Sequence, residues 1–429
     1  MGILIKGGRV IDPATGTDEV RDILIEDGII KKIGKSVTSK NAEVIDAKDK
    51  WVMPGFIDMH VHLRDPGQTA KEDLETGCAA AAAGGFTGLV AMPNTKPPID
   101  NADQFLYVDN KAKALTRVHV YQAGCLTKGM EGKELSDIDG MAKAGCIAFS
   151  EDGKSVMNTG LTVAAMKKLK EIDAPFLDHC EDITLRGDGC MNEDENAERL
   201  GLPGISNAVE NVIAIRDIYL SGDIGSRLHL CHCSTKESVA IVRGAKKEGI
   251  KVTAEVCPHH FALTSDAIER GQFMTNYKMN PPLRTQADVD ALIQGLKDDV
   301  IDVIATDHAP HTADDKNEKF ERAPFGIVGL ETAAALVYTK LVDTEILTPV
   351  QMAAKMSTNP AKILNVAGGS LDVGSPADVV IFDPKAVWTV DKTKFKSKSR
   401  NTPFDGMELK GKVVRTIAGG DTIYEEDPS

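Results

Sequence analysis

Five residues whose side chains commonly bind metal ions stand at the ends of short apolar stretches of this chain. They are His60, His62, His179, His232 and Asp307. Short apolar runs bounded by turn residues are typical of buried parallel strands. The carboxyl ends of parallel strands meet at one edge, where α/β barrels keep their active sites. Imidazole and carboxylate groups gathered at that edge predict a site for zinc or a similar divalent ion.

The pair His60 and His62 is the most specific of these signals. Side chains alternate between the two faces of a strand, so residues two apart point in the same direction. A single pair of this kind is compatible with a purely structural role. The equivalent positions of His179, His232 and Asp307 favour the functional interpretation.

The number of candidate ligands suits two metal ions rather than one. A catalytic zinc usually takes three protein ligands and one water, whereas two metals ~3.5–4 Å apart share a larger set and a bridging group. The stretch Ser150-Glu151-Asp152-Gly153 offers the bridge. Both Glu151 and Asp152 remain open as the bridging residue on spacing alone, and Asp-Gly is also a turn signal.

Polar residues near the same strand ends predict how an organic substrate is held. Arg64 follows His62 by two residues, and its guanidinium suits a carboxylate bound beside the metals. Asn94 follows the second predicted strand and Asn280 lies beyond the seventh. Each asparagine is either a substrate contact or a turn residue, which is the commonest role of asparagine in loops.

The stretch after the last predicted strand holds three ionisable residues in a row of six. Asp307 is positioned to bind a metal and to move protons, whereas spacing leaves the roles of His308 and His311 open. Exposed backbone at 324–326 is a further candidate for contact with a ligand.

Composition limits the class of protein. The chain has 429 residues, is 42% hydrophobic and carries a net charge of −14, so we expect neither nucleic acid nor an anionic membrane as a partner. Its apolar runs are shorter than the ~18 residues of a membrane span. Residues 1–7 lack the features of a signal peptide, which predicts a cytoplasmic protein. The 8 cysteines are sparse and irregularly spaced, which predicts reduced thiols, with Cys231 and Cys233 in the core.

The order of the predicted elements favours an α/β fold. Helical patterns at 74–83, 208–220, 236–247 and 288–296 separate the predicted strands, and two more follow at 329–341 and 348–357. This alternation predicts a (β/α)8 TIM barrel over 55–364. Both termini read as short strands and turns, which predicts one small β-rich domain from residues 1–54 and 365–429. The stretch 183–207, rich in glycine and acidic residues, is expected to be a mobile loop. The predicted strands are 56–62, 88–93, 117–123, 145–150, 174–179, 227–232, 251–256 and 300–307.

Five longer motifs contain most of these residues, at 54–64, 91–95, 255–260, 279–284 and 305–311. In these motifs the chain resembles the amidohydrolase superfamily and, within it, the dihydroorotases of the bacterial class I type. The resemblance extends over nearly the whole chain. It implies zinc-dependent, reversible hydrolysis of dihydroorotate to N-carbamoyl-aspartate in pyrimidine (UMP) biosynthesis. It also implies a homodimer or a complex with aspartate carbamoyltransferase.

The resemblance also implies a set of site residues. Two Zn2+ per chain are expected, bridged by Asp152 and a hydroxide, with Asp307 as the catalytic residue that transfers protons. The implied metal ligands are His60, His62, Asp152, His179, His232 and Asp307. The implied substrate contacts are Arg64, Asn94, Asn280, His311, Phe325 and Gly326.

Two other functions fit parts of this pattern less well. A dihydropyrimidinase, hydantoinase or allantoinase acts on a ring without a carboxylate, so Arg64 and His311 would have no anion to hold. The bridging lysine expected in those enzymes is also missing from 150–153, and Lys154 lies beyond that stretch. A non-catalytic scaffold that binds aspartate carbamoyltransferase would not need all six metal ligands.

Overall fold

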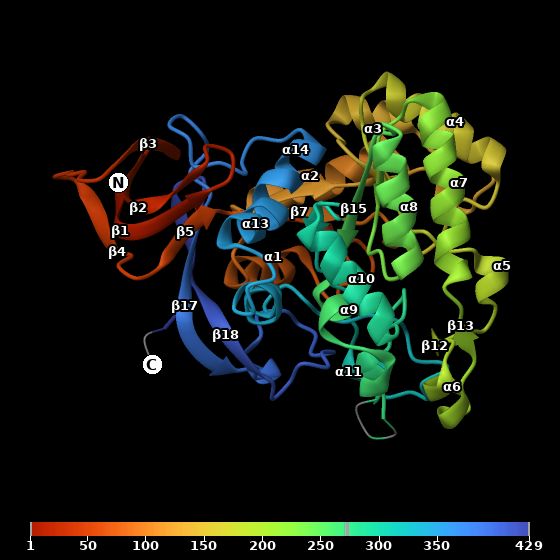
Figure 1. Ribbon diagram of the computed structural model, residues 1–429. Coiled ribbons are helices and arrows are strands. Elements are labelled where there is room, and N and C mark those ends of the chain that lie inside the picture. Colours follow the sequence, from red (N-terminus) through yellow and green to blue (C-terminus); the bar gives the residue numbers. More distant parts are fainter. Residues whose placement is uncertain (1, 270, 272–273, 428–429) are drawn as a thin grey trace.

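A computed structural model describes residues 2–269, 271 and 274–427, in a mixed arrangement of α helices and β strands. Strands from the two ends of the chain lie together, beside the part formed by the middle of the chain (Figure 1). Residues 1 and 428–429, which fall within the predicted terminal domain, lie outside the described residues. No helix in the described part is long and apolar enough to span a membrane.

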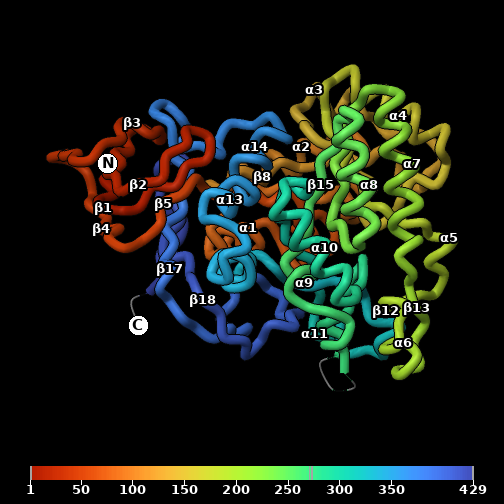
Figure 2. Tube along the Cα trace, in the orientation of Figure 1, coloured from red at the N-terminus to blue at the C-terminus, as the bar shows by residue number. Residues whose placement is uncertain are grey.

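One mixed sheet of eight strands joins the two termini, in the order β19-β18-β17-β5-β1-β2-β3 with β4 paired to β1. The sheet forms because β17 pairs antiparallel with β5, which brings the C-terminal strands beside the N-terminal ones (Figure 2). Its apolar side packs Ile5, Ile23, Val379 and Ile417 into one buried cluster. The strands are β1 (Gly2–Asp12), β2 (Thr17–Glu26), β3 (Ile29–Gly34), β4 (Ala42–Asp46), β5 (Trp51–Pro54), β17 (Val379–Thr389), β18 (Glu408–Ala418) and β19 (Asp421–Glu425).

The middle of the chain forms parallel strands that follow one another in sequence order. One sheet has the order β6-β7-β8 and another the order β9-β10-β11-β14-β15-β16. At the far edges, Val61 at the end of β6 pairs in parallel with His308. The strands are β6 (Phe56–Val61), β7 (Phe86–Ala91), β8 (His119–Gln122), β9 (Gly124–Cys125), β10 (Phe149–Ser150), β11 (Phe176–Asp178), β14 (Leu228–Leu230), β15 (Val252–Val256) and β16 (Val303–Ile304).

Several of these strands are shorter than predicted. The apolar stretch 300–307 contains only β16, because the N–H groups of Val300 and Ile301 bond to Gly295 O and close the preceding helix. The stretch 145–150 contains only β10, and Cys146 N–H likewise bonds to Met141 O at a helix end. Buried residues of a helix-to-strand turn therefore give the same apolar pattern as the strand itself.

Helices connect the parallel strands and cover them on the outside (Figure 1). Helices α1 and α8 begin and end where the sequence predicts, with Asp73 and Thr235 as their N-caps. The predicted helices 329–341 and 348–357 are each an α helix followed by a π-helical turn, η4 (Tyr338–Val342) and η5 (Ala354–Thr358). The helices are α1 (Leu74–Ala83), α2 (Ala102–Leu115), α3 (Ile138–Ala144), α4 (Thr159–Glu171), α7 (Ala208–Ile224), α8 (Lys236–Lys247), α9 (Pro258–Ala262), α10 (Gln286–Lys297), α11 (Ala313–Lys316), α12 (Ala333–Val337), α13 (Pro349–Ala353) and α14 (Asn359–Leu364).

The prediction of a loop at 183–207 is wrong. This stretch contains α5 (Ile183–Arg186) and α6 (Glu195–Leu200), and the strands β12 (Met191–Asn192) and β13 (Gly204–Ile205) pair in parallel. Asp182 and Asp194 cap the two helices. Met191 and Leu200 join a small buried cluster that holds the stretch against the rest of the protein. The glycine and acidic residues of this stretch are typical of a loop, although two of the aspartates cap helices and several apolar residues are buried.

Candidate metal centre and active site

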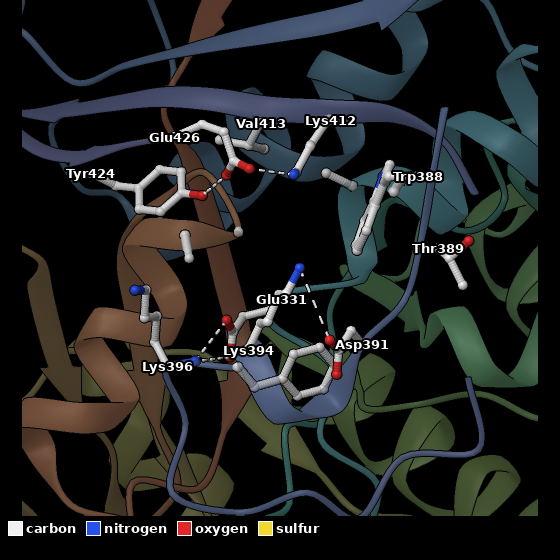
Figure 3. A pocket seen from close by; sticks show the side chains of 15 residues that line it. Glu331, Trp388, Thr389, Asp391, Lys394, Lys396, Lys412, Val413, Tyr424 and Glu426 are labelled. Atoms are coloured by element: carbon white, nitrogen blue, oxygen red, sulfur yellow. Dashed lines mark hydrogen bonds and ion pairs between the residues drawn. The ribbon is translucent and has the colours of Figure 1, made fainter. Parts of the chain in front are cut away.

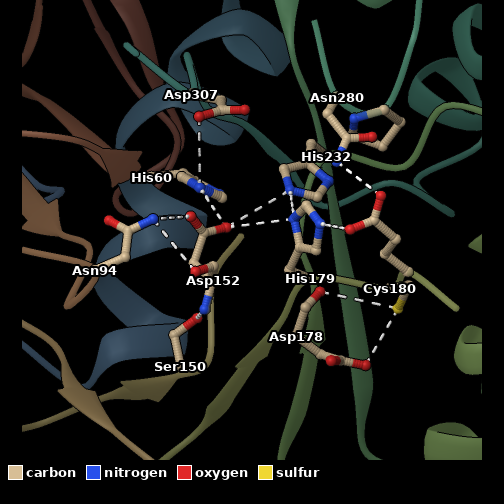
Figure 4. Close-up of polar contacts among 12 residues, drawn as sticks. His60, Asn94, Ser150, Asp152, Asp178, His179, Cys180, His232, Asn280 and Asp307 are labelled. Carbon is tan, nitrogen blue, oxygen red and sulfur yellow. Dashed lines mark hydrogen bonds and ion pairs between the residues drawn. The ribbon is translucent and has the colours of Figure 1, made fainter. Parts of the chain in front are cut away.

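All six predicted metal ligands are buried and lie together at the carboxyl ends of the parallel strands. Figure 4 shows five of them, namely His60, Asp152, His179, His232 and Asp307. His60 lies in β6, where the register of pairing with β7 shifts between Asp58 and Val61. The other five residues follow the ends of their strands, as the sequence predicts. They are His62 after β6, Asp152 after β10, His179 after β11, His232 after β14 and Asp307 after β16.

Asp152 lies among the four histidines. Its Oδ1 is 3.1 Å from His60 Nε2, 3.5 Å from His179 Nδ1 and 3.8 Å from His232 Nε2. Its Oδ2 is 3.4 Å from His62 Nε2. Burial favours the neutral carboxyl of Asp152, but the charge of His60 and the hydrogen bonds from His179 and His232 outweigh it and hold its pKa well below the ordinary value. A carboxylate in contact with every histidine is suited to a bridging position.

Glu151, the other candidate for the bridge, points to a different part of the protein. Its carboxylate accepts hydrogen bonds from Leu126 N at 3.0 Å, Thr127 N at 3.1 Å and the Thr127 hydroxyl. It therefore fixes the backbone after β9. The geometry distinguishes the two acidic residues where their spacing could not.

Asp307 completes the cluster from the opposite side. Its Oδ1 is 3.1 Å from His62 Nε2 and 3.6 Å from His60 Nε2. Burial opposes ionisation of Asp307, yet the charge of His60 and the hydrogen bond with His62 lower its pKa below the ordinary value. The carboxylate is consequently ionised at neutral pH.

The donor atoms fit a divalent metal. His60 Nε2 is buried and has no hydrogen-bond partner among the residues that the structure describes, although carboxylate oxygens face it. One ligand atom from each of His60, His62 and Asp307 lies within 4.8 Å of the others, and the same holds for His60, Asp152 and His232. A buried imidazole nitrogen without a hydrogen-bond partner, facing two carboxylates, is in the environment that a metal ion satisfies.

Sequence reasoning missed the carboxylate that orients this cluster. Glu255, at the end of β15, is fully buried and lies 2.9 Å from both His60 Nδ1 and His229 Nε2. It also accepts the backbone N–H of His232 at 3.2 Å. Its presence in the motif 255–260 was the available signal. His229, in β14, is the second histidine that contacts Glu255.

Three residues of the site have left-handed backbone conformations, with φ of 58° at Arg64, 34° at His232 and 45° at Asp307. Such conformations are strained in residues other than glycine and tend to gather at functional sites. Surrounding hydrogen bonds hold them. Asp58 accepts the N–H groups of His60 and Thr306 and so ties the ends of β6 and β16 together.

A cavity of about 310 Å³ opens beside the cluster, and all six predicted substrate contacts line it. Arg64 donates to Pro310 O at 3.2 Å. Burial lowers the pKa of its guanidinium to about 10, against the charges of Asp307 and Asp152. The residue therefore remains a cation at neutral pH. The six residues are Arg64, Asn94, Asn280, His311, Phe325 and Gly326.

The polar side chains of this cavity are held by neighbours. Asn94 Oδ1 is 3.0 Å from His62 Nδ1, and its Nδ2 donates to Asp152. Asn280 Nδ2 donates to Glu181, which is another residue that sequence reasoning missed. His311 Nε2 donates to Phe325 O at 2.9 Å. Burial and the nearby charges of Arg64 and Lys316 hold the pKa of His311 far below its ordinary value, so its ring is neutral.

The remaining candidates lie outside the cluster. His308 points away from it, with Nε2 3.3 Å from Glu72 and Nδ1 accepting from Gly329 N. Lys154 donates to Met130 O. Cys231 and Cys233 are buried in apolar clusters, as predicted. His259 and His260, which belong to the motif 255–260, are buried in α9, and their rings pack edge to face with centroids 4.3 Å apart.

The family model and the full-length relatives point to the same family. Residues 49–238 match a family model described as dihydro-orotase-like. A dihydroorotase of Geobacter metallireducens is 50% identical over 426 residues, which cover 99% of this chain and 100% of that protein. A dihydroorotase of Acetivibrio thermocellus is 47% identical over 424 residues, covering 99% of each. The structure of an L-hydantoinase (dihydropyrimidinase) from Arthrobacter aurescens is 28% identical, with a TM-score of 0.88 over 99% of this chain and 96% of that one. The chain therefore belongs to the dihydroorotase family.

Proposed function

We propose that this chain catalyses the reversible hydrolysis of dihydroorotate to N-carbamoyl-aspartate in pyrimidine biosynthesis. Its full-length relatives are dihydroorotases, and as a member of their family it is an enzyme that hydrolyses a cyclic amide. The observation that carries the choice of substrate is the buried Arg64, which lines the same cavity as Asp152 and Asp307. A guanidinium there suits a ring carboxylate that lies beside the metals.

The proposed scaffold is a (β/α)8 barrel over residues 55–364, with residues 1–54 and 365–429 as a small β domain. The sequential order of the parallel strands supports a barrel, as does the pairing of Val61 with His308 between the first strand and the end of the last. The likeness to the L-hydantoinase structure, at a TM-score of 0.88, supports the same arrangement. A barrel gathers strand ends into one mouth, which accounts for the convergence of six ligands.

We propose that the six ligands hold two Zn2+ ions with Asp152 shared between them, because its carboxylate contacts all four histidines. An aspartate bridge corresponds to the class I type. Bound divalent ions lower the pKa of water and polarise the carbonyl group that is attacked. Glu255 fixes the ring of His60 so that Nε2 faces the other ligands.

The chain's own residues then divide the work of hydrolysis. Asp307 is ionised and lies at the cluster, so it accepts the proton lost by the attacking water and returns it to the leaving amide nitrogen. Arg64 holds the carboxylate of the substrate and thereby orients the ring. Asn94, Asn280, His311 and the backbone at 325–326 line the remaining walls.

A hydantoinase-type activity is the second candidate, favoured by the likeness to the L-hydantoinase structure. Against it stand Arg64 and the neutral His311, which form a wall suited to an anion. Asp152 also stands where those enzymes are expected to have a bridging lysine. These residues favour dihydroorotate hydrolysis over a hydantoinase-type activity.

A substrate panel tests the proposal. Purified protein loaded with Zn2+ is assayed with dihydroorotate, dihydrouracil, hydantoin and allantoin, and with N-carbamoyl-aspartate for the reverse reaction. The proposal predicts turnover of dihydroorotate in both directions and much lower kcat/KM for the rings without a carboxylate. Preference for dihydrouracil or hydantoin would refute it.

The proposed setting is the cytoplasm, with the enzyme acting as a homodimer or in a complex with aspartate carbamoyltransferase. Light scattering of the pure protein, alone and mixed with aspartate carbamoyltransferase, separates these assemblies. If the pure protein has the mass of one chain, and if mixing with aspartate carbamoyltransferase gives no larger species, both assemblies are contradicted.

A further inference from the structure

Two loops that line the catalytic cavity are joined by a residue from the C-terminal part of the chain. Asn401 is 4% exposed, and its amide makes three hydrogen bonds. Its Oδ1 accepts the N–H of His311 at 3.1 Å. Its Nδ2 donates to Ala309 O and to Gly326 O, each at 3.0 Å. One side chain therefore fixes the loop after β16 and the loop at 324–326 relative to each other.

The position of Asn401 is itself fixed along residues 395–401, which we call the connecting segment. Glu331 accepts the N–H groups of Lys396 and Ser397. Figure 3 shows Glu331 with Lys396 among the residues lining another cavity, of about 420 Å³. Glu72, fully buried, accepts the Ser397 hydroxyl and the Lys398 N–H. The segment is thus held by two acidic side chains of the α/β part before it reaches Asn401.

The opposite side of the loop at 324–326 is held by two buried lysines. Lys278 Nζ donates to Phe320 O at 2.6 Å and to Glu321 O at 3.0 Å, and it lies 4.5 Å from the Phe325 ring centroid. Lys316 Nζ donates to Pro324 O at 2.8 Å. The loop is therefore fixed on this side as well. Asn401 supplies the contact that joins it to His311.

The loop at 324–326 is closely packed, because there is almost no free space around Gly326. Its φ is 152°, and a Cβ there would lie 2.5 Å from Ala309 O and 2.8 Å from His311 Cδ2. The two loops therefore pack directly against each other at the points that Asn401 bridges. A small displacement of either loop changes the shape of the cavity wall that faces the substrate.

We propose that Asn401 is a positioning residue, which sets the distance between His311 and the 325–326 backbone and so shapes the wall that receives the substrate ring and its carboxylate. This inference rests on the proposed function, since it takes His311 and that backbone as substrate contacts. It also means that the catalytic cavity is complete only with a residue from the segment between β17 and β18. The three hydrogen bonds of the Asn401 side chain go to the backbone of His311, Ala309 and Gly326, none of which is one of the six metal ligands, so its effect is on substrate and not on metal.

The test compares two variants of the full-length, Zn2+-loaded enzyme. Asn401→Asp keeps the oxygen that accepts the N–H of His311. It replaces the donating Nδ2 with a carboxylate oxygen, which then faces the carbonyl oxygens of Ala309 and Gly326. Asn401→Ala removes all three bonds without adding charge, and so serves if the buried aspartate prevents folding. We expect KM for dihydroorotate to rise at least about tenfold in either variant, kcat to fall less than KM rises, and metal content to stay unchanged.

Gln122→Glu is the matched control, because Gln122 is also a buried amide that donates to two backbone carbonyls, Ala91 O and Ala123 O, both at 2.9 Å. It should lower the unfolding temperature and leave KM within about twofold of wild type. The inference is overturned if both Asn401 variants keep KM within about threefold, if they lose metal, or if Gln122→Glu raises KM as much. Wild-type protein that fails to hydrolyse dihydroorotate would instead refute the proposed function, and this inference with it.

Discussion

His60 and Glu255 are joined by a contact of 2.9 Å between the imidazole Nδ1 and a carboxylate that is fully buried. Glu255 also binds His229, and these two histidines lower its pKa far below the ordinary value although burial opposes the shift. An ionised carboxylate at Nδ1 holds the proton on that nitrogen. When a metal takes the place of the proton on Nε2, that nitrogen presents its lone pair on the side of the ring where Asp152 and Asp307 lie. Such carboxylate–histidine pairs orient metal ligands and make them more basic.

Replacing this carboxylate should weaken metal binding without removing a ligand. We expect Glu255→Gln to lower metal affinity by ~10–100-fold, the usual effect of losing a group that orients a ligand. Competition with a chromophoric chelator measures the affinity. Asp288→Asn is the control, since this buried carboxylate caps α10 and contacts none of the six ligands. Equal metal affinities of Glu255→Gln and wild type would contradict the role of Glu255 in orienting His60.

The two neighbouring acidic residues after β10 should behave differently. Asp152→Asn should release at least one metal and nearly abolish turnover, because Asp152 is in contact with all four histidines. Glu151→Gln should retain both metals and lose stability only, because Glu151 binds the backbone of Leu126 and Thr127. Elemental analysis and turnover of the two variants decide the matter. Loss of metal from Glu151→Gln alone would reverse the assignment.

Arg64 should provide selectivity for a carboxylate. Arg64→Ala should lower kcat/KM for dihydroorotate by an amount equivalent to at least ~2 kcal/mol, as the loss of a buried charged partner usually does. Arg64→Lys should restore little, since a lysine lacks the two-pronged geometry of the guanidinium. Both variants keep a non-glycine residue at the strained φ of 58°, so backbone strain is the same in the comparison. Normal turnover by Arg64→Ala would disprove the role.

Some of this arrangement follows from the sequence, for a physical reason. Strand ends with His or Asp are local signals, so His60, His62, His179, His232 and Asp307 could be predicted to converge. The ends of α1 and α8 could also be predicted, because they are determined by residues next to them in the sequence, such as their N-caps. Partners that reach the site from distant segments left no local signal. Asn401 and Glu72, which bind the loop after β16, could not be predicted for that reason.

The contact between His119 and Asp378 should make stability depend on pH. His119 Nε2 lies 3.1 Å from Asp378 and links β8 to the residue before β17. The hydrogen bond to Asp378 raises the pKa of His119 above its ordinary value, although burial opposes the shift. The stabilisation is therefore fully present below the unfolded pKa of about 6.5 and is lost as pH rises through the folded pKa. His119→Gln should lower the unfolding temperature at about pH 6 and not at about pH 9. A difference from wild type that is equal at both pH values would contradict this linkage.

In the proposed mechanism Asp307 transfers protons and does more than bind metal. Asp307→Asn tests it most directly, because asparagine keeps an oxygen donor and tolerates the φ of 45°, yet it cannot accept a proton. The measurement is steady-state turnover of dihydroorotate, with metal content and substrate affinity determined on the same sample. We predict that turnover falls ~10²–10⁴-fold while metal and substrate still bind. Retention of more than about a tenth of wild-type turnover with full metal would show that Asp307 is only a ligand, since loss of a general base lowers the rate at least ~10²-fold.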